Sequence, residues 1–158
     1  MNFNTLLFTL IILSSSLFSQ SKKEIKKYKI KASLITSTEN GKTLNESKII
    51  YDSNGNPVEK TNYAKDGSVK TINKIKYNDN GDDIEDNEYD ASNKLIEKTI
   101  TKYNANGDKI EEAIYDGAGK LTKKHIYTYD SKGLKVERKT LDASDKLIST
   151  KLHTYLFK

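Results

Sequence analysis

The stretch YNANGDKIEEAIY, residues 103–115, has a tyrosine at each end and one Asn-Gly step between them. Nearly the same frame, YNDNGDDIEDNEY, occupies residues 77–89, so the frame recurs after 26 residues. Glycine and asparagine accept the positive φ angles that tight turns require. The recurrence therefore predicts a repeated unit in which each tyrosine precedes a turn.

Tyrosines mark this repeat along most of the chain, at intervals that alternate between 12 and 14 residues. A Gly, Asn or Asp stands four positions after each marker, which predicts a turn there. Connections of five or six residues join antiparallel neighbours, because parallel strands need a much longer crossover. The markers are Tyr51, Tyr63, Tyr77, Tyr89, Tyr103, Tyr115, Tyr129 and Tyr155, with Leu141 at the position that lacks a tyrosine.

The segments between the turns predict an all-β fold, an antiparallel meander of about ten strands in a curved open sheet or partial shell. The repeat domain covers residues 37–158, and residues 22–36 form a basic segment and the first strand, which we expect to begin near Ile25. Segments such as DKIEEAIYDGAGK, residues 108–120, also fit a helix. Strands are favoured because the frequent turn residues keep any helix below the ~12–15 residues that an isolated helix needs.

Charged residues give a first register for the sheet. If Tyr77 faces Ile84 across one rim, and Tyr89 faces Leu95 across the other, residues of opposite charge meet on neighbouring strands. Each such pair stabilises a sheet by ~0.2–1 kcal/mol. The predicted pairs are Lys76–Glu85, Lys102–Glu111, Asp86–Lys98 and Glu112–Lys124.

Composition limits the architecture further. Only 35% of the 158 residues are hydrophobic and 31% are charged, which favours a thin or repetitive fold over one with a thick core. The chain has no Cys, so a disulfide framework, a thiolate metal site and a lipid anchor on cysteine are excluded.

The first residues have the layout of a secretory signal peptide. The apolar run LLFTLIIL, residues 6–13, is followed by SSSLFSQS and then by KKEIKKYKIK. We predict a signal peptide over residues 1–21, cleaved after Ser19 or Ser21, and a secreted or periplasmic mature chain without a transmembrane span. An uncleaved membrane anchor is the alternative, because MNFN lacks Lys and Arg, although the run is shorter than the ~20 residues of a span.

The stretch YTYDSKG, residues 127–133, carries a Y-x-Y-D-x-x-G frame that resembles the YD repeats of rearrangement-hotspot (RHS) proteins. IIYDSNGN, residues 49–56, and IKYNDNGD, residues 75–82, are looser copies, and the resemblance spans residues 37–155. It implies curved sheets of β-hairpins, which in long members wrap around toxins or display surfaces outside the cell. This chain departs in its strict 12/14 alternation, its lack of Arg before the tyrosine and its small size. It is also similar to the Gly-punctuated tyrosine repeats of small antitoxin-like proteins.

Metal and catalytic patterns are weak. His125 and His153 have no matching carboxylate cluster, which favours a structural role. NDNGDD, residues 78–83, resembles a calcium loop, but Lys76 and Asn87 stand where EF-hand ligands belong, which leaves weak calcium binding as the alternative. Glu111 and Glu112 point to opposite faces of a strand, and no nucleophile motif or phosphate loop is present. We predict a non-enzymatic protein without cofactor or metal.

Two sets of residues are candidates for ligand contact. The basic segment would meet an anionic envelope polymer rather than nucleic acid in an exported chain, although lysines on a terminal strand also block edge-to-edge aggregation, the favoured interpretation. Its members are Lys22, Lys23, Lys26, Lys27, Lys29 and Lys31.

The other set is a row of tyrosines about 9.5 Å apart along one rim, which would stack on sugar rings. We favour a structural role, in which each tyrosine packs over the Val or Ile that opens the next strand. Its members are Tyr51, Tyr77, Tyr103, Tyr129 and Tyr155.

Together these features predict an exported, non-enzymatic β-repeat module with a binding or structural role at the bacterial envelope or outside the cell. Its partner would be an envelope glycan or protein. The alternative is an accessory component of a toxin system, either an immunity protein or a shell-derived fragment.

Overall fold

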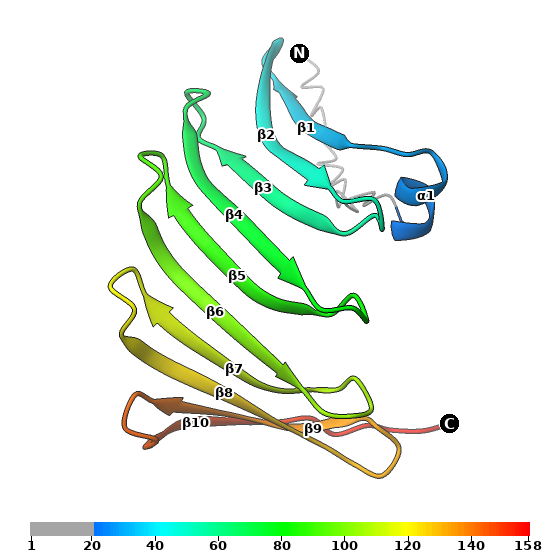
Figure 1. Cartoon of the computed structure of the whole chain (residues 1–158), viewed down its shortest axis with the longest axis vertical. Helices are drawn as coiled ribbons and strands as arrows, with labels where there is room; N and C mark the ends of the chain where they lie inside the picture. Colours follow the sequence, from blue (N-terminus) through cyan, green and yellow to red (C-terminus); the bar gives the residue numbers. More distant parts are fainter. Residues whose placement is uncertain (1–20) are drawn as a thin grey trace, which may run out of the picture.

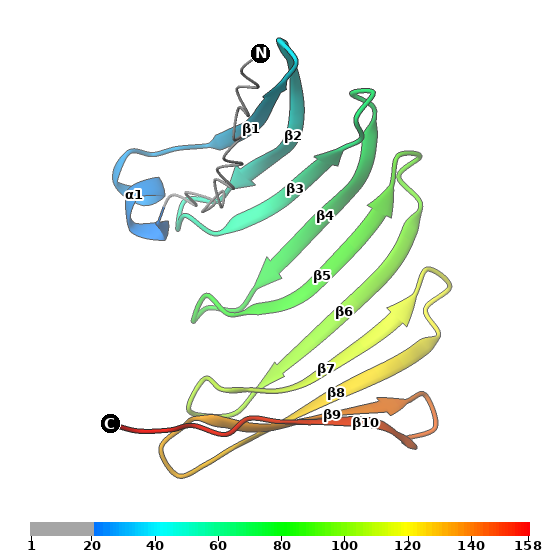
Figure 2. The same cartoon turned by 180° about the vertical axis from the view of Figure 1, so that it is seen from behind.

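The computed structural model describes residues 21–158 as one open sheet of ten strands. Each strand is antiparallel to the next in the chain, which confirms the predicted all-β meander (Figure 1). The sheet curves and twists without closing (Figure 2). The predicted signal peptide, apart from Ser21, lies outside the described residues. The elements are α1 (Lys22–Lys27), β1 (Ala32–Glu39), β2 (Lys42–Tyr51), β3 (Pro57–Tyr63), β4 (Val69–Tyr77), β5 (Asp83–Asp90), β6 (Leu95–Tyr103), β7 (Lys109–Asp116), β8 (Leu121–Tyr129), β9 (Lys135–Asp142) and β10 (Leu147–Leu152).

Eight of the turns share one backbone geometry. In the β7–β8 turn, the Gly119 amide donates to the Asp116 carbonyl at 2.9 Å and the Asp116 amide donates to the Lys120 carbonyl at 2.9 Å. This is a type I turn followed by one left-handed residue, a common three-residue hairpin loop. The left-handed residues stand four positions after each marker, as predicted: Gly55, Gly67, Gly81, Asn93, Gly107, Gly119, Gly133 and Asp145.

The residue directly after each marker explains why the turns form. The Asp116 carboxylate accepts the amides of Ala118 and Lys120 at 3.0 and 2.9 Å, which closes the loop with a side chain. Asp or Asn fills this position in every one of the eight turns except that of Ala64, where Asp66 accepts from Ser68 instead. The tyrosine-Asp or tyrosine-Asn pair is therefore a turn signal.

A bulge beside each of these eight turns sets the register. Tyr77 lies opposite Asp83, not Ile84, and Ile84 is then skipped so that Lys76 faces Glu85. The predicted partner of Tyr77 was therefore wrong by one residue, but the bulge restores the predicted ion pair at 2.8 Å. Lys102–Glu111, at 2.8 Å, is confirmed in the same way.

The same bulge makes the other two ion-pair predictions wrong. Tyr89 does face Leu95, but the bulge at Ile96 then places Lys98 opposite Asn87. Lys98 reaches diagonally to Glu85, at 3.2 Å. On the next hairpin, Lys124 lies opposite Ala113 and pairs with Asp145, while Glu112 lies opposite His125.

The sheet is a single layer. Among the described residues, only Ile25, Ala113 and Ile114 are buried hydrophobics. Because side chains alternate between faces and each turn adds a bulge, the markers at the two rims project from opposite faces. We call the rim with Tyr51, Tyr77, Tyr103, Tyr129 and Tyr155 the tyrosine rim, and the sheet face from which they project the tyrosine face. The rim with Tyr63, Tyr89, Tyr115 and Leu141 is the opposite rim.

The basic segment differs from the prediction. Residues 22–27 form the helix α1, and the first strand begins only at Ala32. Ser21 and Glu24 form a capping box that starts the helix, and Lys29, with a φ of 52°, breaks any continuous strand. The lysines of α1 are therefore not edge-strand residues. Within residues 21–158 no helix is long and apolar enough to cross a membrane.

Candidate functional site

The tyrosines of the tyrosine rim form a ladder of hydrogen bonds between neighbouring strands. The Tyr77 hydroxyl donates to the Pro57 carbonyl at 2.8 Å, and Pro57 lies 20 residues earlier, at the start of the preceding strand. The same contact recurs at three later tyrosines, and Tyr51 bonds the Ser33 hydroxyl at 3.0 Å instead. The later contacts are Tyr103 to Asp83 at 3.1 Å, Tyr129 to Lys109 at 2.8 Å and Tyr155 to Lys135 at 2.8 Å.

This ladder shows what holds the predicted tyrosine row. Burial raises the pKa of Tyr77 to about 12, with nearby Asp83 adding to the effect. Burial and the Asp83 hydrogen bond also raise the pKa of Tyr103. Four of the five hydroxyls bond a backbone carbonyl, and Tyr51 bonds Ser33. The residues directly opposed to the first four tyrosines are not the expected Val or Ile but Pro57, Asp83, Lys109 and Lys135. Stacking on sugars through the ring faces stays a prediction.

Helix α1 covers the first turn of the tyrosine rim. Ile25, 1% exposed, packs against Gly55: a Cβ on Gly55 would lie 3.5 Å from the Ile25 Cβ and 2.7 Å from the Lys22 carbonyl oxygen. Only glycine fits there, since the position also has a φ of 80°. The helix is thus fixed against the loop of residues 52–56.

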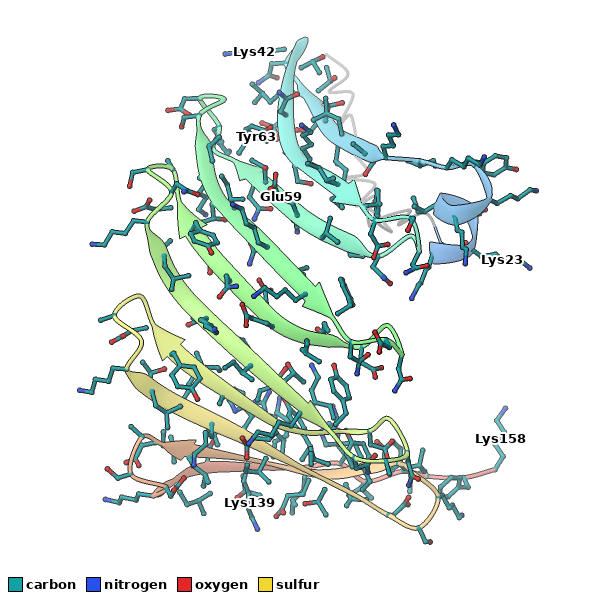
Figure 3. All side chains as sticks on the ribbon, viewed as in Figure 1. Lys23, Lys42, Glu59, Tyr63, Lys139 and Lys158 are labelled. Carbon is teal, nitrogen blue, oxygen red and sulfur yellow. The ribbon has the colours of Figure 1, made fainter. Side chains whose placement is uncertain are left out.

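A cleft of about 790 Å³ separates α1 from the next turn. We call it the rim cleft. Lysines from α1 form one wall, and amide and carboxylate side chains from the loops 52–56 and 78–82 form the other. Figure 3 shows Lys23 on α1, at the tyrosine rim, and Lys42 and Tyr63 at the other rim. The lining residues are Lys22, Lys23, Lys26, Asp52, Asn54, Asn56, Tyr77, Asn78, Asp79, Asn80 and Gly81.

Part of the loop wall of the rim cleft is fixed, because the turn of residues 52–56 holds the Asp52 and Asn56 side chains. Asp52 accepts the Asn54 and Asn56 amides at 2.8 Å each, and the Asn56 side chain donates to it at 2.9 Å. Burial opposes ionisation of Asp52, but these bonds and the Lys22 charge outweigh burial and lower its pKa. Asn56 is only 4% exposed. Asp79 and Asn80, by contrast, are not used by the turn and face the cleft.

The predicted lysines separate into groups. Lys22, Lys23 and Lys26 line the rim cleft, and the Lys22 ammonium would lie 3.0 Å from a Cβ on Gly81. Lys26 is shared with a second hollow of about 650 Å³, whose floor is Ile25, Ile30, Ile50 and Tyr51 and whose edge carries Lys29 and Lys31. Lys27 lies over the Tyr28 ring, 4.9 Å from its centroid.

His125 and the loop of residues 78–83, the candidates for catalysis or metal binding, make hydrogen bonds within the sheet and its turns. His125 bonds the Thr140 hydroxyl at 3.1 Å, and burial lowers its pKa. In the loop at 78–83, Asn78 and Asp82 bond each other at 2.9 and 3.0 Å to close the turn. Across residues 21–158 no three His, Asp or Glu side chains are grouped closely enough to hold a metal ion.

A polar cluster on the tyrosine face was not predicted. Glu112 accepts from Lys109 at 2.8 Å and from the Tyr127 hydroxyl. Burial opposes its ionisation, and these two hydrogen bonds outweigh burial and lower the pKa of Glu112. The cluster depends on the register of β7 against β8, which a bulge shifts by one residue from the predicted register: Glu112 lies opposite His125 rather than Lys124.

No family model matches the chain, and no curated protein matches it. The solved structures that resemble its fold include three whose TM-scores, all below 0.5, carry no functional argument. A protein of unknown function from Bacteroides fragilis is 15% identical with a TM-score of 0.42, covering 80% of this chain and 96% of that chain. S. aureus TarM is 16% identical with a TM-score of 0.32, and the match covers 80% of this chain and 22% of TarM. A DUF3836 family protein from Parabacteroides distasonis is 16% identical with a TM-score of 0.26, and the match covers 72% of this chain and 91% of that protein.

Proposed function

We propose that the protein is an exported, non-enzymatic binding module of the bacterial envelope, which holds an anionic glycan in the rim cleft. The observation that carries the proposal is the cleft lining, in which three lysines face loops of asparagine and aspartate beside Tyr77. Ammonium groups pair with carboxylate or phosphate groups on a polymer. Amide and carboxylate side chains bond sugar hydroxyls, and a tyrosine ring offers a face for a sugar ring.

Position and rigidity also support this function. The cleft lies at the capped first end of the repeat, where α1 adds the basic wall that later turns lack. Because the Asp52 and Asn56 side chains are already fixed by the turn, these two side chains lose little entropy when a ligand binds. The neighbouring turns at 104–108 and 130–134 continue the same rim, so a long polymer would meet similar loops beyond the cleft (Figure 1).

Binding to an acidic polysaccharide tests the proposal. The triple variant Lys22→Gln, Lys23→Gln, Lys26→Gln should bind polygalacturonate at least about tenfold more weakly than the parent, a change of only 1.4 kcal/mol over three contacts. The matched control removes three exposed lysines of the opposite rim: Lys65→Gln, Lys94→Gln, Lys120→Gln. The control should bind within about twofold of the parent. Equal losses in both variants would show nonspecific charge attraction and refute a site at the rim cleft.

The proposed export is tested by the position at which the signal peptide is cleaved. Ser21 caps α1, so cleavage after Ser19 keeps the capping box and cleavage after Ser21 removes it. We expect the mature chain to begin at Gln20, as read from the intact mass of periplasmic or secreted protein. A full-length chain in the membrane fraction would contradict export.

A further inference from the structure

The last strand, β10, leaves one edge of the sheet open. Within the described residues β10 pairs with β9 alone, and all six of its residues are exposed. Leu152 is 71% exposed, whereas Ile126, at the same repeat position in β8, is half-buried between two strands. Natural sheets protect such edges with proline, several charges or a covering element. β10 has one lysine, Lys151, and no proline.

The first strand, β1, leaves the other edge open in the same way. Among residues 21–158 it pairs with β2 alone, and Leu34 is 56% exposed. Strands alternate in direction through the sheet, so β1 and β10 run in opposite directions. A second copy placed with its β1 beside β10 would continue the antiparallel order and keep the two rims aligned.

The backbone groups of the two edges are complementary. The Tyr51 amide donates to the Lys31 carbonyl at 2.9 Å, so Lys31 faces β2. Because backbone groups alternate in direction along a strand, Leu34 turns its N–H and C=O outward. The His153 amide donates to the Val136 carbonyl at 2.9 Å, so Leu152, one residue earlier, also turns its N–H and C=O outward.

The side chains of the two leucines lie on the same face. Ser33 bonds Tyr51 on the tyrosine face, so Leu34, the next residue, projects from the other face. Leu152 is three residues before Tyr155, as Ile126 is before Tyr129, and therefore also projects from the other face. Leu34 and Leu152 thus both turn their backbone N–H and C=O outward and project their side chains from the same face. These are the two conditions for a directly opposed, hydrogen-bonded pair between copies.

We propose that copies of this chain associate head to tail, with β1 of one copy paired to β10 of the next and Leu34 beside Leu152. The contact is heterologous, because each copy uses two different edges, and the assembly is open-ended. Every added copy extends the sheet by ten strands and repeats the rim cleft along the same rim.

Proline at an outward-facing amide tests the contact without removing a bond inside the chain. Thr150 lies two residues before Leu152 and shares its outward direction. By sedimentation velocity, the average mass of the parent should rise over a hundredfold range of concentration. Thr150→Pro and Leu34→Pro should each stay monomeric, and Thr150→Ala should assemble like the parent. Circular dichroism checks that each variant keeps the strand content of the parent.

Mixing the two proline variants distinguishes this contact from others. Thr150→Pro keeps a free β1 edge and Leu34→Pro keeps a free β10 edge, so the mixture should form a one-to-one complex and nothing larger. A parent that stays monomeric at every concentration would overturn the proposal. Dimers of Leu34→Pro alone would also overturn it, because they would show β10 pairing with β10.

If Thr150→Pro fails to fold, Leu152→Lys replaces it, with Leu156→Lys as control because Leu156 is 95% exposed beyond the strand. Leu152→Lys should weaken association at least about tenfold. Equal association of the two lysine variants would contradict the proposed pair.

Discussion

The two rims of the sheet have the same turns but use their tyrosines differently. At the opposite rim, Tyr63, Tyr89 and Tyr115 lie directly opposite Val69, Leu95 and Leu121. Directly opposed residues project from the same face, which is the arrangement in which an aromatic and an aliphatic side chain stabilise a strand pair. At the tyrosine rim the directly opposed residues are Pro57, Asp83, Lys109 and Lys135. The hydroxyls there bond the preceding strand instead, at a backbone carbonyl for Tyr77, Tyr103 and Tyr129 and at the Ser33 hydroxyl for Tyr51. The residue six positions after the marker therefore decides whether a tyrosine contributes its ring or its hydroxyl.

Exchanging the rims should have the largest effect. Deleting 26 residues, Tyr77–Lys102, joins equivalent positions and keeps every later tyrosine at its own rim. Deleting 13 residues, Tyr77–Tyr89, moves every later strand to the wrong rim and face. We expect a cooperative thermal unfolding transition for the 26-residue deletion and none for the 13-residue deletion. Circular dichroism as a function of temperature measures both. Similar transitions in both would show that the rims are interchangeable.

Removal of whole side chains should separate the rims next. Tyr103→Ala loses ring burial and the bond to Asp83, which should cost about 3 kcal/mol of unfolding free energy. Tyr89→Ala loses ring burial and the Lys74 ammonium that lies 5.1 Å from the ring centroid, but no hydroxyl bond to a preceding strand, about 2 kcal/mol. Chemical denaturation of both variants measures the difference. A larger loss for Tyr89→Ala would reverse the assigned roles.

The fold was predictable because turn chemistry and period are local. Tyrosine spacing, the left-handed position and the short connections sufficed for the meander. Strands of nine and six residues implied bulges or overhang, but the positions of the bulges were not predictable, since Ile84 and Ile96 carry no signal that they are skipped. Two of the four expected ion pairs were therefore one residue out. The rim cleft was not predicted, because the first strand was expected to begin near Ile25 and no helix was expected before it, although Ser21 and Glu24 have the S-x-x-E spacing of a capping box.

Removing the side chain that closes a turn should lower the unfolding free energy equally at both rims. Asn104→Ala at the tyrosine rim and Asp116→Ala at the opposite rim each remove a side chain that accepts two loop amides. Each should cost about 1 kcal/mol of unfolding free energy. Chemical denaturation tests both, with Ala118→Ser, an exposed turn residue, as control. Unequal losses would place the difference between the rims in the turns rather than in the tyrosines.

Ionisation of tyrosine gives the smallest of these effects. Burial raises the pKa of Tyr77 to about 12, against 10.0 for a free phenol. Because the folded pKa is the higher one, the stability it contributes is complete below pH 10 and is lost as the pH rises toward 12. Ultraviolet titration of the folded protein should show phenols that ionise above pH 10, and this late phase should vanish in denaturant. A single step at pH 10 in the folded protein would contradict buried, bonded hydroxyls.

Tyrosine hydroxyls bond the preceding strand at the tyrosine rim, and in residues 21–158 the tyrosines of the opposite rim make no such bond. The most direct measurement is the unfolding free energy of paired Tyr→Phe variants, which remove only the hydroxyl. Tyr129→Phe should lose about 1 kcal/mol, because its 2.8 Å bond to the Lys109 carbonyl disappears. Tyr115→Phe, at the opposite rim, should stay within about 0.5 kcal/mol of the parent. Equal values for the two variants would contradict the account.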